Sequence, residues 1–216
     1  MQKIAAVERF ENVGINCEFG FVQRALGCEA GGLLRWAFCP PASLLKLFER
    51  DFAGLFLFEN LMPDFGMVRD AAYDIAFHTR MKSDSVGWLH DEDTRRAIHA
   101  EEVAKVAHLL EKFRGRLQDP DVVFVVKDNQ GVPQDLRIEL AQAFGARSAG
   151  RLLVVDTTPD PALVGTVIEH GDYVEGLIDR FAPYPESDKF SPAWLEILAA
   201  FERHCPPALL AEKSHA

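Results

Sequence analysis

Two short, wholly apolar runs constrain the fold more than any other feature of the chain. Val122–Val126 holds four valines and a phenylalanine, and Leu152–Val155 holds two leucines and two valines. Strands that are buried on both faces of a sheet have this composition. The segment between the runs, from about Pro133 to Phe144, predicts the helix that a parallel connection needs. The second half of the chain is therefore predicted to contain a parallel strand–helix–strand unit.

The remaining pattern predicts an α/β protein with a central mixed sheet flanked by helices. Helices are expected at 17–26, at 40–50, at 92–118 and after Ser191-Pro192, and strands are expected within 54–79 and 165–178. Residues 1–13 fit either a strand or a short helix. We predict a single α/β domain over residues 1–205, with a mixed α+β arrangement as the alternative, and a frayed tail over 206–216.

The charge balance argues against several classes of partner, although a local basic patch is compatible with it. The chain has 23 Lys and Arg against 33 Asp and Glu, so its net charge is −10 at pH 7. Because nucleic-acid surfaces are rich in Lys and Arg, no nucleic-acid partner is expected. No apolar run approaches the roughly 20 residues of a membrane helix, and the first residues lack the apolar segment of a signal peptide. The chain is therefore expected to be cytoplasmic, without a membrane partner; the sequence predicts no oligomeric state.

The cysteine spacing and the absent motifs predict no cofactor and no metal. Cys17, Cys28, Cys39 and Cys205 are widely spaced, which is typical of free thiols and not of a disulfide framework or a zinc site. The chain lacks the glycine-rich nucleotide motifs and the Gly-x-Ser-x-Gly elbow of serine hydrolases. The run from His90 to Asp93 predicts a solvated helix start.

Cys17 is the first candidate for chemistry. It lies where the helix at 17–26 is predicted to begin, and the N–H groups of a helix start stabilise a thiolate, so a lowered thiol pKa is expected. Gly14 would leave room for a substrate, whereas Glu18 opposes the effect by adding negative charge. The alternative is a cysteine that only packs in the core, as most free cysteines do.

His78 is the candidate general base for Cys17. In the predicted strand at 73–78 it alternates with Phe77, so the two side chains point to opposite faces. A strand end is a rigid place from which an imidazole can reach a thiol. A solvated histidine at the strand end is the alternative for His78, and His170, in a predicted turn, is the second candidate base.

Further polar residues are candidates for a supporting role. Asp156 and Asp128 follow the two apolar strands, and the carboxyl ends of parallel strands are where α/β proteins place ligand groups. Asp156 could orient a catalytic histidine, and both could equally cap turns. The candidates for binding a substrate or its oxyanion are Asn16, Gln23, Arg24, Arg35, Asp128 and Arg180.

The first part of the chain resembles a known bacterial family. The run Val13-Gly14-Ile15-Asn16-Cys17-Glu18-Phe19-Gly20, with Gln23-Arg24 and Leu33–Phe38 after it, is similar to an uncharacterised family described as predicted papain-like cysteine peptidases, which opens on Gly-x-Asn-Cys or Gly-x-Asp-Cys. Ile75–His78 is similar to that family's strand ending in histidine. The resemblance covers roughly the first 80 residues clearly and the rest loosely.

This resemblance implies a nucleophile at Cys17 and a base at His78, in the order that papain-like enzymes use. Two features depart from it: no Asn or Asp after His78 plainly completes a triad, and the parallel unit differs from the antiparallel barrel half of papain. The expected function is a thiol-dependent hydrolase or acyl transferase acting on a small-molecule, peptide or acyl substrate. The alternatives are a carbohydrate- or nucleotide-sugar-binding transferase of surface-polysaccharide metabolism, which the resemblance also implies, and a non-catalytic binding domain.

Overall fold

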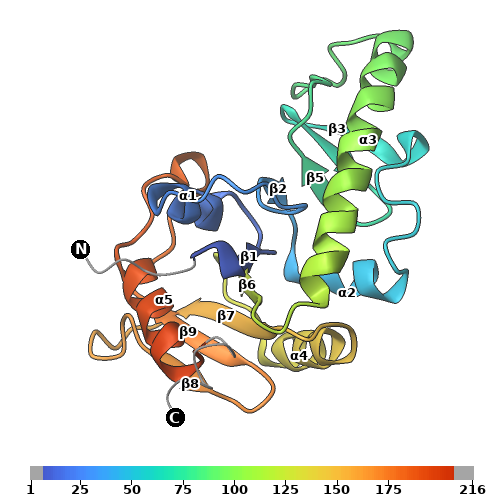
Figure 1. The fold of residues 1–216 in the computed structure, drawn as a ribbon. Helices are drawn as coiled ribbons and strands as arrows, with labels where there is room; N and C mark the ends of the chain where they lie inside the picture. Colours follow the sequence, from blue (N-terminus) through green and yellow to red (C-terminus); the bar gives the residue numbers. More distant parts are fainter. Residues whose placement is uncertain (1–6, 207–216) are drawn as a thin grey trace.

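The structure is a computed structural model that describes residues 7–206. Its larger sheet confirms the predicted parallel unit, because β6 and β7 are parallel neighbours joined through helix α4 (Gln134–Arg147) (Figure 1). The four parallel strands of this sheet are followed by an antiparallel edge strand. In spatial order the strands are β1 (Phe10–Asn12), β6 (Val123–Lys127), β7 (Arg151–Thr157), β9 (Val174–Ile178) and β8 (Val167–Glu169).

The apolar runs form central strands because both faces of the larger sheet are covered. Val123 and Val125 of β6 belong to a cluster that includes residues of α1 (Glu18–Ala25) and α5 (Ala193–His204). Phe124 and Val126 point to the other face, where residues of α2 (Pro41–Glu49), α4 and the C-terminal end of α3 (Glu92–Leu117) cover them. Alternate side chains of one strand thus enter two different cores, which explains the continuous apolar run.

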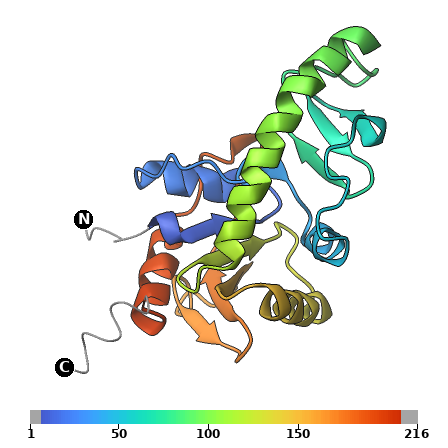
Figure 2. The same ribbon diagram turned by 45° about the vertical axis from the view of Figure 1, so that its right-hand side comes forward.

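The strands predicted within 54–79 form a second, antiparallel sheet. They are β3 (Leu61–Asp64), β4 (Met67–Asp70) and β5 (Ile75–Phe77), and the two-residue strand β2 (Ala37–Phe38) joins β5. This sheet lies along α3, which extends past the larger sheet (Figures 1 and 2). The short 3₁₀ segments are η1 (Val7–Arg9), η2 (Phe58–Asn60) and η3 (Tyr184–Glu186).

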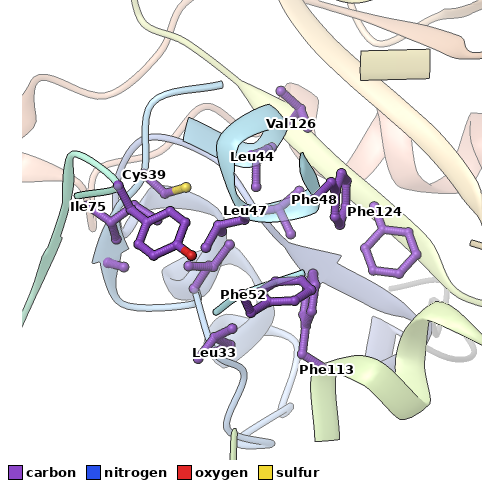
Figure 3. Packing of buried hydrophobic residues seen from close by; sticks show 14 of the residues in the cluster. Leu33, Cys39, Leu44, Leu47, Phe48, Phe52, Ile75, Phe113, Phe124 and Val126 are labelled. Atoms are coloured by element: carbon purple, nitrogen blue, oxygen red, sulfur yellow. The ribbon is translucent and has the colours of Figure 1, made fainter. Parts of the chain in front are cut away.

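One hydrophobic cluster joins the two sheets into a single compact α/β domain. It contains Ile75 of the smaller sheet and Phe124 of the larger one, with side chains of α2 and α3 between them (Figure 3). The ring centroids of Phe113 and Phe124 are 5.8 Å apart, and those of Phe52 and Phe113 are also 5.8 Å apart. The smaller sheet therefore has no core separate from that of the larger sheet among the described residues.

The expected helices begin and end close to their predicted positions. Asp91 is the N-cap of α3 and accepts a hydrogen bond from Thr94 N at 2.8 Å, as the predicted helix start at 90–93 requires. Residues 7–12 contain both alternatives, a 3₁₀ turn and then a strand, and 165–178 holds two strands where one was expected. Most of the predicted tail, residues 207–216, lies outside the described part of the chain. Within residues 7–206, no helix combines the length and apolar character needed to cross a bilayer.

Gly176 of β9 tests the packing of α5 on the larger sheet. A Cβ added there would lie 2.7 Å from Ile197 Cγ2 and 3.3 Å from Val155 Cγ2. Gly176→Ala is therefore expected to lower the free energy of unfolding, measured in urea, by about 1–3 kcal/mol, because a buried helix side chain must move.

Gly145→Ala is the matched control for this prediction. Gly145 lies in α4 with no atom within 4 Å of the added Cβ in the described structure, so alanine is expected to stabilise the helix by about 0.5–1 kcal/mol. Equal effects of the two substitutions would show that α5 does not rest on Gly176.

Candidate functional site

The chain turns sharply at the carboxyl edge of the larger sheet, between β1 and α1. Gly14 N donates to Asn12 Oδ1 at 3.1 Å, and Asn12 Nδ2 donates to the backbone oxygen of Arg35 at 3.1 Å. A Cβ on Gly14 would lie 3.2 Å from Lys127 Cγ. The space beside Gly14, expected to admit a substrate, is thus filled by the Lys127 side chain. This glycine lets β1 and the end of β6 approach each other.

A fully buried ion pair lies directly under this turn. Glu18 and Lys127 have no exposed side-chain surface, and Lys127 Nζ is 2.7 Å from Glu18 Oε2. Glu18 Oε1 accepts hydrogen bonds from Trp194 Nε1 at 3.0 Å and from Ala182 N at 3.1 Å. Burial lowers the pKa of Lys127, and the Glu18 carboxylate opposes this by favouring the charged ammonium. The pair therefore joins β6, α1, α5 and the segment after β9.

Two asparagines extend this network around Cys17. Asn16 Oδ1 accepts from Glu18 N at 3.0 Å, which caps the first turn of α1 in place of a Cys17 side-chain bond. Asn16 Nδ2 donates to Asn129 Oδ1 at 3.3 Å, and the same oxygen accepts from Lys127 Nζ at 2.6 Å. Both sequence neighbours of Cys17 thus make buried contacts, and these contacts fix the backbone on either side of the cysteine.

Cys17 and His78 line one open cleft of about 470 Å³. Cys17 is half-buried at the start of α1, and His78 follows β5 and is exposed. The residues that share the cleft with them include Phe21, Phe65, Met67 and Tyr184. Within residues 7–206 no hydrogen bond joins Cys17 Sγ to His78. The structure therefore brings the two candidates to the same space without a direct bond between them.

The expected lowering of the Cys17 pKa is wrong. Burial raises the pKa of this thiol above its ordinary value. The physical reason is that Lys127, the cation nearest in the network, is held by Glu18 and Asn129, so the helix start alone does not offset the desolvation of a thiolate. Burial and the neighbouring Lys82 lower the pKa of His78, so its imidazole is neutral at pH 7.

Three of the predicted binding residues lie outside the walls of this cleft. Gln23 Nε2 donates to Phe10 O at 2.7 Å, and the buried Arg35 donates to the backbone oxygens of Gly20 and Cys28. Arg24 is exposed, pairs with Glu29 at 3.1 Å and lies 4.7 Å from the ring centroid of Trp36. The groups that make these bonds serve contacts within the protein, although Gln23 Oε1 and Arg35 Nε are buried without a hydrogen-bond partner in the described part of the chain. Asn16, by contrast, both lines the cleft and supports Cys17.

The other predicted residues also lie outside the walls of the cleft. Asp128 accepts from Gln130 N at 2.9 Å in a turn, Asp156 pairs with Arg137, and Arg180 donates to Lys189 O at 3.3 Å. His170, the second candidate base, pairs with Glu175 at 2.9 Å. The structure thus unites Asn16, Cys17 and His78 and leaves Asp156 outside their cleft.

Sequence reasoning missed Lys127 and Tyr184. Lys127 ends an otherwise apolar strand, and a charged residue in that position is a signal of a buried partner. Tyr184 opens η3 and lines the cleft, where burial and then the neighbouring Cys17 raise the pKa of its phenol. His78 additionally borders a second cavity of about 80 Å³, which Trp36, Phe56 and α3 enclose.

Comparison of the chain with protein-family models, with curated proteins and with solved structures finds no match. The resemblance to the predicted papain-like family therefore stays a prediction. The four cysteines are free, as their spacing predicted. Over residues 7–206, no three His, Cys, Asp or Glu side chains are grouped so that they could hold a metal ion.

Removing the ammonium of Lys127 is expected to destabilise the protein strongly. Lys127→Met leaves the Glu18 carboxylate buried without a counter-charge, so the free energy of unfolding in urea should fall by about 3–5 kcal/mol. Lys189→Met, at an exposed pair with Glu186, should change it by less than about 1 kcal/mol. Combining Glu18→Gln with Lys127→Met should restore part of the loss; a double variant as unstable as the sum of the two would contradict a coupled pair.

The pH dependence of the alkylation rate of Cys17 should reflect the raised pKa of its thiol. Because iodoacetamide reacts with the thiolate, the labelling rate of Cys17 in the free protein should still be rising above about pH 8.5, the ordinary cysteine pKa. The buried Cys28 and Cys39 should label more slowly at every pH. Peptide mass spectrometry measures the three rates in one sample. A Cys17 rate that is already at its plateau below pH 7 would show a stabilised thiolate instead.

Proposed function

We propose that the protein is a thiol-dependent hydrolase or acyl transferase in which Cys17 is the nucleophile and His78 the general base. The observation that carries the proposal is that these two side chains, far apart in the sequence, one at the start of α1 and the other after β5, line the same open cleft. The buried contacts of Asn16 and Glu18 support it, since they hold the nucleophile on a rigid element. The free state of the four cysteines fits a reducing cytoplasm.

The chemistry follows from the two groups. Cys17 gives its thiol proton to the neutral imidazole of His78 while its sulfur attacks the carbonyl carbon of the substrate. The tetrahedral intermediate then expels the alcohol, thiol or amine, which takes the proton from His78 and leaves a thioester on Cys17. Water, or an acceptor alcohol or amine, attacks that thioester as His78 removes its proton. The C–S bond breaks, the product acyl group leaves, and the proton returns to Cys17.

Proton transfer belongs to the attack step in this mechanism. Papain-like enzymes hold a thiolate and an imidazolium before the substrate binds. Here burial favours the thiol, and burial together with Lys82 favours the neutral imidazole, so the resting pair is uncharged. That combination still suits general base catalysis, which needs one group to hold the proton and the other to accept it.

The alternative of a carbohydrate or nucleotide-sugar site at the ends of β6 and β7 has less support. Its expected ligand groups make contacts within the protein: Asp128 in a turn, Asp156 with Arg137 and Asn129 with Lys127 and Ala182. A non-catalytic domain would keep Cys17 and His78 in place without acyl transfer, and the following experiment separates it from the proposal.

Acylation of the protein by p-nitrophenyl acetate tests the proposal. We expect release of p-nitrophenolate with an acetyl group on Cys17, seen by peptide mass spectrometry, and no such adduct in Cys17→Ala. His78→Ala should slow acylation by about 100-fold or more, the usual contribution of a general base. His108→Ala, at an exposed position on α3, should leave the rate unchanged.

The pH dependence of the acylation rate shows whether His78 acts as the general base. Acid protonates His78, so the wild-type rate should fall only as pH drops through a value below about 6.5, the ordinary histidine pKa. In His78→Ala the rate should instead follow the thiolate of Cys17 and rise above about pH 8.5. The same profile in both proteins would overturn the role of His78, and labelling of a cysteine other than Cys17 would overturn the nucleophile.

A further inference from the structure

The hairpin between β3 and β4 presents a phenylalanine in an unusual backbone conformation. Asp64 pairs with Met67 across the turn, so Phe65 and Gly66 form a two-residue loop. Their φ values are +44° and +87°, both in the left-handed region. Loops of this kind favour Asn-Gly, because a bulky side chain is strained at positive φ. Phe65 is thus a poor choice for the turn itself.

The turn is nevertheless stabilised by hydrogen bonds with the Ser83 side chain. The buried Ser83 hydroxyl accepts hydrogen bonds from Asp64 N at 3.2 Å and Gly66 N at 3.1 Å, and it donates to Met67 O at 3.0 Å. Phe65 itself is 80% exposed, so it gains almost nothing from packing within the protein. The fold therefore holds an exposed aromatic residue at this turn. No packing contact among the described residues offsets the free-energy cost of its left-handed backbone conformation.

Phe65 belongs to the wall of the cleft that contains Cys17. Phe65 lines it together with Met67 of the same hairpin, Phe21 of α1 and Tyr184. These side chains form the apolar part of the cleft that contains the thiol. Tyr184 is 55% exposed, and its hydroxyl is 3.8 Å from the sulfur of Met67. An exposed aromatic surface at the mouth of a cleft is a surface that an apolar ligand would cover.

We infer that Phe65 is a specificity-determining residue that binds the apolar acyl group of the substrate. The inference rests on the proposed function and narrows it to acyl compounds with an aliphatic or aromatic group next to the carbonyl that Cys17 attacks. Asp188 on the same cleft and the net charge of −10 disfavour acidic acyl groups. Strain at Phe65 is then compensated in the complex, where the ring loses its contact with water.

Phe65→Asn tests this role without weakening the fold. Asparagine followed by Gly66 suits the turn better than phenylalanine, so the melting temperature should stay the same or rise. The rate of Cys17 acylation by p-nitrophenyl hexanoate should fall about tenfold, and the rate with p-nitrophenyl acetate should change less than about twofold. Phe65→Leu should keep most of the hexanoate rate. Met62→Gln is the matched control, since Met62 is an exposed residue of the same hairpin that lies outside the cleft walls.

Alkylation by two maleimides makes the result independent of acyl transfer. At pH 9, the ratio of the Cys17 alkylation rates with N-phenylmaleimide and N-methylmaleimide should be larger in the wild type than the same ratio for free cysteine, and Phe65→Asn should lower this preference to the free-cysteine value. If the esters fail to acylate Cys17 but the maleimide preference depends on Phe65, the proposed hydrolase or transferase is overturned and apolar binding at Phe65 is supported. If acylation occurs, and Phe65→Asn changes neither the preference for hexanoate over acetate nor the preference between the maleimides, the proposed function stands and this inference is overturned.

Discussion

The buried ion pair of Glu18 and Lys127 is the interaction on which the arrangement of the site depends. Two charges without exposed surface are tolerated only when each has partners, and here Trp194, Ala182 and Asn129 supply them. These partners come from α5, from the segment after β9 and from the loop after β6. Displacing any one of these elements would leave a buried charge or its partner unsatisfied, so the pair fixes their relative positions and, with them, the first turn of α1.

The residues that line the cleft come from segments that follow both sheets. Cys17 and Tyr184 follow strands of the larger sheet, whereas His78, Phe65 and Met67 belong to the smaller one or its turns. A continuous hydrophobic cluster connects the sheets, so the distance between thiol and imidazole is set by core packing. This explains how a site can be defined although no hydrogen bond between Cys17 and His78 holds it within residues 7–206.

The sequence predicted the elements better than their partners. The valine-rich strand at 122–126 and the cap at Asp91 carry local signals, and both were found where they were expected. The pairing of β3, β4 and β5 in a sheet of their own depends on contacts with α3 that no local pattern encodes. For the same reason Cys17 and His78 could be proposed from their positions, whereas Arg35 and Asp156 could not be recognised as residues with partners inside the protein. The sequence gives the identity of a polar side chain, but only the fold shows which group it binds.

The placement of Lys127 also bears on how the thiol would be controlled. A cation directed at Cys17 would give a permanent thiolate, which is open to oxidation and to unspecific alkylation. Lys127 is instead paired with Glu18, and burial leaves the thiol protonated. In the proposed mechanism, reaction would then require a carbonyl group that is already held beside the sulfur and the neutral imidazole of His78. Under the proposed function, a low resting reactivity of the thiol and the aromatic side chains that line the cleft would be complementary, because binding of the acyl group by Phe65 would precede activation of the nucleophile.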